Sequence, residues 1–317
     1  MKRVLVLSVA LGLLWVIARP AAQQPSAGVS PSDLVSSWTL TSIERGLSSG
    51  KPERTPNARG LLIFDAAGHA FEIFTSVNRQ VPDAPQADAL RTFSSSGGFW
   101  GGYRVDAAQK TIMFKAEGAV SPSLMGREFS RTLEQTGDRL TMTSVDEPHA
   151  QGGIRWTWER VPTVDNLSPL YRQVVGFWQH VVEKRVNVTT GAVLSESKRS
   201  PSVIVYTPGG FVGVHFPPLN RKPFAAETPT PEEARAALMG YVGYYGALTV
   251  YPGQVFHNIL AGVSPLSGTT LRRFVELSGN EVTVRFPPTT NQQGQLTTTL
   301  VTLRRLSGEA DMLPRRR

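Results

Sequence analysis

The chain has 317 residues, of which 40% are hydrophobic and 18% charged, with a formal net charge of +8 and no cysteine. This composition excludes a predominantly disordered protein, and the length suits about two globular domains. The absence of cysteine excludes disulfides, thiolate metal sites and a lipid-modified amino-terminal cysteine. Core packing alone must therefore hold the domains together.

Residues 1–22 predict an export signal. Lys2 and Arg3 precede an apolar run over residues 4–17, and two alanines follow it. The run is shorter than the roughly 18 residues of a membrane-spanning helix. We therefore expect a periplasmic or secreted protein, attached to a membrane only if the signal stays uncleaved. Residues 23–31 are rich in Pro, Ser and Gly and predict a flexible lead-in.

Much of the positive charge lies at the two ends of the chain. Cleavage of the signal removes three cations, and three more lie at 315–317 in a tail that we place at 307–317. The remaining chain is close to neutral and contains no patch of interleaved basic and aromatic residues. The sequence thus predicts no nucleic-acid partner, and we expect the tail to be solvated.

The rest of the sequence contains a faint internal repeat. Its matching segments are Leu34-Val-Ser-Ser-Trp38 with Val174-Val-Gly-Phe-Trp178, the hairpins 61–73 with 203–215, Gly118-Ala-Val-Ser-Pro122 with Gly262-Val-Ser-Pro265, and 156–160 with 300–305. Gly68 and Gly210 occupy the position in each hairpin turn that needs a positive φ. The order of these matches predicts a duplication with units at 32–161 and 170–306. A Pro-containing linker at 162–169 separates them.

Each copy contains about eight strand candidates and one short helix. In the second copy the strands are expected near 177–186, 202–207, 211–217, 248–251, 254–262, 269–278, 281–287 and 297–306. Thr230-Pro-Glu-Glu233 predicts a helix start with a capping box, and we expect that helix to run to about Gly243. Its weaker counterpart is expected near 87–93. Eight antiparallel strands close naturally into a barrel, so the predicted fold is all-β with two tandem barrels.

Several segments of the second copy resemble the bacterial lipocalin-like domain family. They are Val175-Gly-Phe-Trp178, Val205-Tyr-Thr-Pro-Gly-Gly210, Thr230-Pro-Glu-Glu-Ala234, Gly240-Tyr-Val-Gly-Tyr-Tyr245, and Phe256-His257 followed by Gly268-Thr-Thr-Leu-Arg-Arg273. The first copy is less similar. The resemblance implies an eight-stranded lipocalin-like barrel whose internal cavity suits a small apolar molecule. It implies no single activity.

Two arginines lie on strand faces whose other residues are mostly apolar. Side chains two apart share a strand face, so Arg273 lies in the same phase as Leu271 and Val275, and Arg131 lies between Phe129 and Leu133. A guanidinium inside a barrel requires an anionic or hydrogen-bonding partner. That partner is either a ligand carboxylate or enolate, or an internal Asp or Glu. A position at the barrel rim is the further alternative.

The remaining candidates are histidines and tyrosines. His257 shares a strand face with Val255 and Ile259, and Met113 is its expected counterpart in the first copy. The imidazole of His257 either contacts a ligand or acts as an acid or base, or it is a hydrogen-bonded core residue. Tyr241, Tyr244 and Tyr245 line a cavity mouth or form a packed plug. His215 is the weakest candidate. The five histidines show no metal-ligand spacing, so we expect no metal and no cofactor.

Three functions fit these features. The preferred one is an exported barrel that binds a small hydrophobic or amphipathic molecule through Arg273, His257 and the tyrosines, with Arg131 and His215 as further candidates. The second is a cofactor-independent isomerase or cyclase in which His257 exchanges a proton and Arg273 stabilises negative charge. The third is a structural or interaction protein whose barrels are filled by their own side chains. No catalytic motif favours an enzyme.

Overall fold

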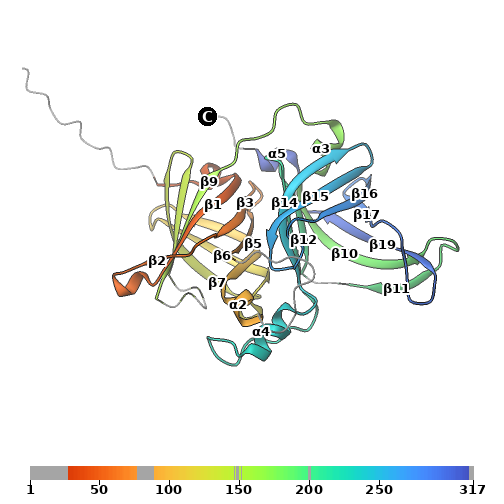
Figure 1. Cartoon of the computed structure of the whole chain (residues 1–317). Coiled ribbons are helices and arrows are strands. Elements are labelled where there is room, and N and C mark those ends of the chain that lie inside the picture. The colour runs from red at the N-terminus through yellow and green to blue at the C-terminus, as the bar shows by residue number, and fades with distance from the viewer. Residues whose placement is uncertain are drawn as a thin grey trace, which may run out of the picture.

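The computed structural model describes residues 28–76, 89–145, 147, 150, 152–198 and 201–313. The predicted export signal and the last four residues of the predicted tail lie outside these residues. Two β-barrels lie side by side in the described part of the chain (Figure 1). This confirms the prediction of two tandem antiparallel barrels.

The first barrel has eight main strands. They are β1 (Ser36–Arg45), β3 (Arg59–Phe64), β4 (His69–Thr75), β5 (Ser96–Asp106), β6 (Thr111–Ala119), β7 (Glu128–Thr136), β8 (Arg139–Ser144) and β9 (Ile154–Arg160). Pairing of β1 with β9 closes the barrel and leaves neither strand as a free edge. The short strand β2 (Glu53–Arg54) extends the end of β1.

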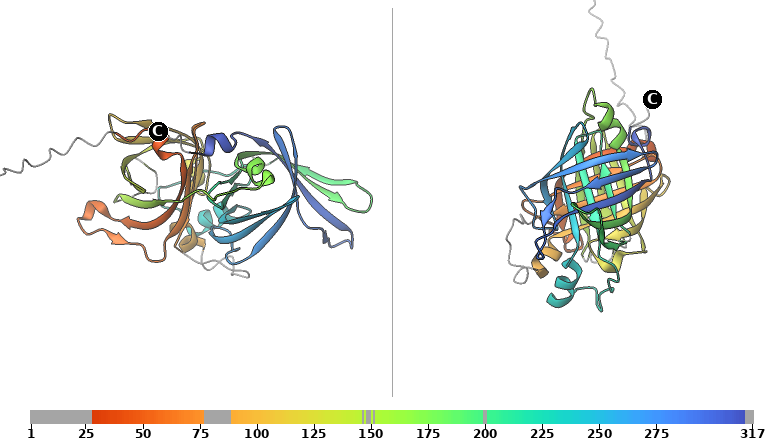
Figure 2. Two further views of the ribbon diagram at one scale, coloured as in Figure 1. Left: turned by 90° about the horizontal axis from the view of Figure 1, so that it is seen from above. Right: turned by 90° about the vertical axis from the view of Figure 1, so that its right-hand side faces the viewer.

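The second barrel repeats this arrangement. Its main strands are β10 (Gly176–Asn187), β12 (Val203–Tyr206), β13 (Phe211–Phe216), β14 (Val242–Tyr251), β15 (Gln254–Gly262), β16 (Thr270–Ser278), β17 (Glu281–Arg285) and β19 (Leu296–Arg305). Pairing of β10 with β19 closes it. Two accessory strands, β11 (Val193–Ser197) and β18 (Thr289–Thr290), extend the sheet, and β11 lies on the side away from the first barrel (Figure 2).

The strand registers support the duplication. In the first copy, register shifts interrupt β1 after Leu40 and β5 after Trp100, and in the second copy they occur at the matching positions, after His180 and Tyr245. These registers define counterparts, meaning positions with the same pairing in the two barrels. One expected counterpart is wrong, because His257 corresponds to Phe114 and not to Met113.

A tryptophan closes one end of each barrel. The indole N–H of Trp38 donates to the carbonyl oxygen of Leu34 in α1 (Pro31–Leu34) at 2.9 Å. That of Trp178 donates to Val174 in α3 (Pro169–Val174) at 2.7 Å. Both tryptophans are fully buried. Both tryptophans are therefore core residues.

The helices α2 (Ala89–Ser94) and α4 (Pro231–Leu238) pack against each other at the opposite end (Figure 1). The capping box of Thr230 and Glu233 is present, as predicted. The helix ends at Leu238, earlier than the expected Gly243, because Gly240 turns the chain with a φ of 70°. Strand β14 therefore begins before the predicted start at 248.

One hydrophobic core joins residues of both barrels, and the interior of the first barrel forms a separate one. Strand β4 contacts β15, and in the reciprocal manner β13 contacts β6. Phe71 of the first copy lies so close to Gly213 that a Cβ there would be 2.5 Å from its ring. Since the matching elements of each copy face one another, the interface has an approximate two-fold relation. The outer faces of these strands are therefore buried as deeply as the barrel interiors.

Part of the predicted tail is ordered. Residues Glu309–Met312 form α5, and Met312 is 1% exposed within the shared core. The carbonyl oxygen of Asp311 accepts a hydrogen bond from the Ala66 amide at 2.8 Å. The expectation of a solvated tail is therefore wrong for this segment. In the part of the chain that the structure describes, no helix is long and apolar enough to cross a membrane.

Candidate functional site

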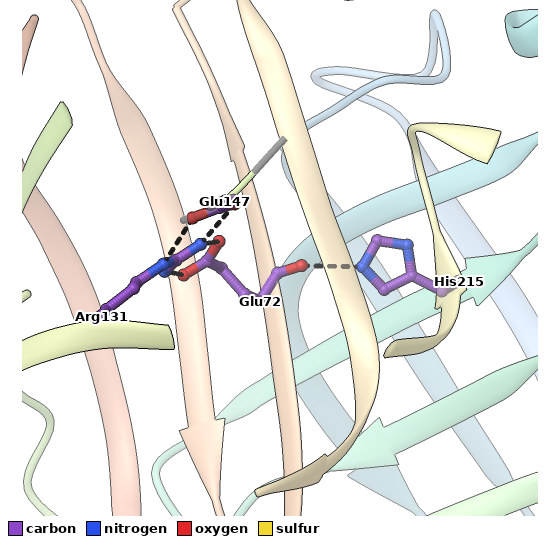
Figure 3. Close-up of polar contacts among 4 residues, drawn as sticks. All are labelled: Glu72, Arg131, Glu147 and His215. Atoms are coloured by element: carbon purple, nitrogen blue, oxygen red, sulfur yellow. Dashed lines mark hydrogen bonds and ion pairs between the residues drawn. The ribbon is translucent and has the colours of Figure 1, made fainter. Parts of the chain in front are cut away.

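Arg131 occupies the interior of the first barrel, in a cluster with two carboxylates (Figure 3). Its guanidinium donates to both carboxylate oxygens of Glu72, at 2.5 and 3.0 Å. It also donates to both oxygens of Glu147, at 2.8 and 2.9 Å. Burial opposes the charged form, but the two carboxylates outweigh it and raise the pKa of Arg131. Arg131 is thus a permanent cation held by the protein's own acids.

Aromatic rings fill the space around this cluster. The guanidinium carbon of Arg131 lies 4.0 Å from the Trp156 ring centre. It lies 5.4–5.7 Å from the ring centres of Phe99, Phe114 and Phe129. All four rings are at most 1% exposed. The partners of Arg131 are therefore internal glutamates, which is the second of the alternatives that the sequence left open for this guanidinium.

Smaller side chains replace most of this cluster in the second barrel. The strand registers pair the two sets, so that Glu72, Phe99, Phe114, Phe129 and Trp156 correspond to Val214, Tyr244, His257, Leu271 and Val301. The loss of ring volume leaves a cavity of about 320 Å³. Its lining residues are Glu183, Ile204, Val214, Phe216, Val242, Tyr244, His257, Leu266, Leu271, Arg273, Val284, Phe286, Thr299 and Val301.

His257 lies in the cavity wall between two phenols. Its Nδ1 is 2.9 Å from the Tyr244 hydroxyl, and its Nε2 is 3.2 Å from the Tyr206 hydroxyl. Burial, with the nearby charge of Arg273, lowers the pKa of His257 to about 3. The imidazole is consequently neutral at pH 7, and each ring nitrogen already has a hydrogen-bond partner.

Arg273 is the counterpart of Arg131 but has different surroundings. Its guanidinium stacks 3.8 Å from the Phe286 ring centre and donates to the Arg272 carbonyl oxygen at 2.8 Å. Among the described residues, no carboxylate forms an ion pair with it. Burial lowers the pKa of Arg273, and the phenols Tyr244 and Tyr206 only partly offset this. Most of its N–H donors remain available to the cavity.

Comparison with known families agrees with this architecture. The sequence pattern of the lipocalin-like domain matches residues 36–161 and 175–305. The chain belongs to the lipocalin-like domain family. A comparison with curated proteins finds no match.

Three predicted site residues lie between the two lipocalin-like barrels and not in the cavity. The His215 Nε2 donates to the Glu72 carbonyl oxygen at 2.8 Å, across the interface (Figure 3). Its Nδ1 accepts from the Tyr241 hydroxyl at 2.5 Å. Tyr245 is buried near Arg59 of the first barrel. The cavity of the second lipocalin-like barrel thus unites Tyr244, His257 and Arg273 of the predicted set.

Sequence reasoning missed four polar residues of the lipocalin-like barrels. Glu72 lies in a hairpin strand between Phe71 and Ile73, and a charged residue in such an apolar run could have indicated a buried polar group. Glu183 lines the cavity from a long strand, and Tyr206 was visible only as part of a hairpin motif. Glu147 follows β8 in a segment without regular pairing, and no sequence pattern indicated it. The described residues contain no group of acids and histidines suited to a metal ion.

Proposed function

We propose that the chain is an exported protein whose second barrel binds a small amphipathic molecule with a carboxylate or similar anionic group. One observation carries the proposal. Val214 stands where the first barrel has Glu72, so that Arg273 faces a cavity without the carboxylates that hold Arg131. A half-buried guanidinium without an anionic partner is a ready site for a ligand carboxylate.

The rest of the cavity wall suits the apolar part of such a ligand. Ile204, Val284 and Val301 provide aliphatic surface, and Phe286 places an aromatic face beside Arg273. Pockets of this kind, apolar with a few polar groups, are typical of small-molecule sites. Glu183 also lines the cavity, so affinity should depend on hydrogen bonds to the guanidinium more than on an overall positive field.

Tyr244 supplies a second polar contact whose character follows the tautomer of His257. A neutral imidazole has one N–H and one bare nitrogen. When Nδ1 carries the proton, it donates to Tyr244 and frees the phenol hydrogen for a ligand acceptor. When Nδ1 is bare, Tyr244 donates to it and can only accept from the ligand. The site can thus adapt to either kind of polar group.

The contacts of His257 do not favour the enzymatic alternative. A general acid or base works best with a pKa near the operating pH and needs direct access to the reacting proton. The pKa of His257, at about 3, lies far from neutrality. Both of its nitrogens are bonded to tyrosines. We therefore assign His257 an orienting role toward Tyr244.

Ligand binding can be tested with 4-phenylbutyrate and its neutral analogue 4-phenylbutanol, by calorimetry on the full chain. We expect Arg273→Gln to weaken binding of the acid at least about ten-fold, since charged hydrogen bonds contribute about 1.5–3 kcal/mol, and to leave the alcohol unaffected. Arg272→Gln is the matched control, because Arg272 is exposed and bonded to Gln254. Equal binding by wild type and Arg273→Gln would refute the assignment.

Export is tested separately. The full chain expressed in a bacterial host should be recovered outside the cytoplasm, and its mass should correspond to loss of a segment ending near residue 22. Mass spectrometry of small molecules that copurify with it would identify the natural ligand. Recovery of the uncleaved chain in the cytoplasm would contradict export without affecting the cavity.

A further inference from the structure

Arg185 of β10 lies on the same wall of the second barrel as Arg273. Arg185 pairs with Thr299, whose carbonyl oxygen accepts from the Phe286 amide of the next strand. Arg273 in turn stacks on Phe286. Residues that face each other across paired strands project to the same side of a sheet. The other three residues line the cavity, so the Arg185 side chain projects to that side as well. Because Arg185 is exposed, it lies at the mouth of the cavity.

The first barrel has the same pair of arginines and provides two acids for them. Arg45 is the counterpart of Arg185, because the two occupy matching positions in the strand registers. Glu72 and Glu147 both bind Arg131. Burial lowers the pKa of Arg45, and the negative charge of Glu147 partly offsets this, so Glu147 acts on both arginines. The first barrel therefore balances two cations with two carboxylates.

The second barrel retains neither of these acids. Val214 occupies the position of Glu72. Glu147 lies between β8 and β9, and the matching segment of the second copy, between β17 and β19, is residues 286–295. This segment contains no Asp or Glu. The duplication has thus kept both arginines and lost both of the carboxylates that serve them in the first copy.

One acid, Glu183, does line the cavity of the second barrel, on the same strand face as Arg185. Glu183 already has an interaction partner, and none of the ion pairs between described residues joins it to Arg185 or Arg273. Each guanidinium carries five N–H donors. Both arginines therefore retain donors for a ligand.

The spacing of the two arginines limits the length of the ligand. Three steps between neighbouring strands, from β16 through β17 and β19 to β10, separate Arg273 from Arg185. At about 4.8 Å per step, their backbones lie about 14 Å apart along the curved wall and closer in a straight line. Because both side chains extend into this space, two carboxylates about 10 Å apart or less can reach them. The cavity of about 320 Å³ has about twice the volume of a cavity that holds benzene, so one ring with a short chain fits.

We infer that the ligand of the second barrel is a dicarboxylic acid with an apolar body. Arg273 binds one carboxylate inside the cavity, and Arg185 binds the other at the mouth, where that carboxylate stays partly solvated. The ligand thereby supplies the two charges that Glu72 and Glu147 supply in the first barrel. This inference rests on the proposed function, which requires only the carboxylate at Arg273, and adds the second one.

The test compares two ligands by calorimetry on the full chain. The diacid 4-(4-carboxyphenyl)butyric acid has one carboxylate for each arginine. Its ester 4-(4-methoxycarbonylphenyl)butyric acid has nearly the same shape and lacks the second charge. We expect the diacid to bind about three- to ten-fold more tightly at low ionic strength. This preference should shrink in about 1 M salt, because the charge of the exposed Arg185 is screened.

Two neighbouring variants assign the preference to one side chain. In Arg185→Gln the diacid should bind no more tightly than the ester. Lys184→Gln is the matched control, because it removes the same charge from the next residue, whose side chain pairs with Glu196 at 3.4 Å on the opposite face of the strand. This control should keep the preference for the diacid. Both changes are at the surface, and circular dichroism checks that both variants fold.

The outcomes separate this inference from the proposed function. Equal affinity for diacid and ester in the wild type would overturn the inference, and so would a preference that persists in Arg185→Gln. If Arg273→Gln still weakens binding of the ester in that case, the proposed function stands. Failure of both ligands to bind the wild type, or binding of both that Arg273→Gln leaves unchanged, would overturn the two together.

Discussion

Glu72 links the two barrels through its two ends. Its carboxylate binds Arg131 inside the first barrel, and its backbone carbonyl oxygen accepts a hydrogen bond from His215 of the second barrel at 2.8 Å. This second bond fixes the tautomer of His215, with the proton on Nε2 and with Nδ1 accepting from Tyr241. Burial lowers the pKa of His215 to about 4, although the Glu72 carbonyl opposes the shift.

Because two histidines are buried in the neutral form, we expect the folded protein to lose stability as the pH falls. His215 and His257 have folded-state pKa values of about 4 and about 3, below the value of about 6.5 of an unfolded histidine. The unfolded chain therefore binds protons first as the pH falls. Each histidine contributes stability that is fully present above pH 6.5 and is lost, at up to about 1.4 kcal/mol per pH unit, toward its folded pKa.

The measurement is the urea-unfolding free energy at about pH 7.5 and about pH 4.5, for wild type and for His257→Gln. We expect the loss on acidification to be about 3 kcal/mol smaller in the variant. His69→Gln is the control of opposite sign, because Asp65 overcomes burial and raises the pKa of His69. An identical loss in wild type and His257→Gln would contradict the buried neutral state.

The fold was predictable from the sequence because it depends on local patterns. Period-two hydrophobicity, turn glycines such as Gly68 and Gly210, and the capping box at Thr230 each act over a few residues. The same pattern placed Arg131 and Arg273 in an interior phase. Local periodicity could not name the partners of Arg131, because Glu72 approaches it only after strands distant in the sequence have come together, and Glu147 lies outside the strands.

The placement of three predicted site residues outside the cavity also has a physical cause. His215 lies in the apolar strand β13, and Tyr241 comes directly before β14, but both are buried where the two barrels meet. Periodicity distinguishes buried from exposed faces and cannot distinguish a barrel interior from an interface between barrels. The counterpart of His257 was placed one residue away, because the spacing between the copies drifts between the first hairpin and β15.

The first barrel should depend on Glu72. In Glu72→Val, Arg131 loses two of its hydrogen bonds inside a closed barrel, and removing one partner of a buried ion pair costs about 3–5 kcal/mol. We expect the free energy of unfolding to fall by about 3 kcal/mol, the lower end of this range, because Glu147 still pairs with Arg131. Chemical denaturation measures it. Glu128→Gln is the matched control, since its pair with Arg104 is exposed and should contribute at most about 1 kcal/mol.

The reciprocal change should close the proposed site of the second barrel. Val214→Glu places a carboxylate at the position that Glu72 has in the first barrel, so that it can pair with Arg273. We expect binding of 4-phenylbutyrate to fall at least about ten-fold while the chain stays folded, because the new acid competes with the ligand. Calorimetry and circular dichroism measure the two effects. The isosteric Val214→Thr, which adds no charge, should retain binding; full binding by Val214→Glu would argue against Arg273 as the anion contact.

Filling the cavity should separate stability from binding. Leu271→Phe restores the ring that Phe129 has in the first barrel, and the added carbons occupy part of the cavity of about 320 Å³. Cavity-filling changes commonly add about 0.5–2 kcal/mol, so Tm should rise while 4-phenylbutyrate binding weakens. Thermal unfolding with calorimetry checks both. A fall in Tm with unchanged binding would show that the cavity is not the ligand site.

The ordered end of the chain should stabilise the pair of barrels. Met312 is 1% exposed and belongs to the core that both barrels share. Met312→Ala should lower the free energy of unfolding by about 2–5 kcal/mol, as is usual for a buried methionine. Leu313→Ala, one residue further and more than a third exposed, is the control and should change it by about 0.5 kcal/mol or less. Equal, small effects of the two changes would mean that α5 does not contribute to the core, and the barrels would then depend on their strand interface alone.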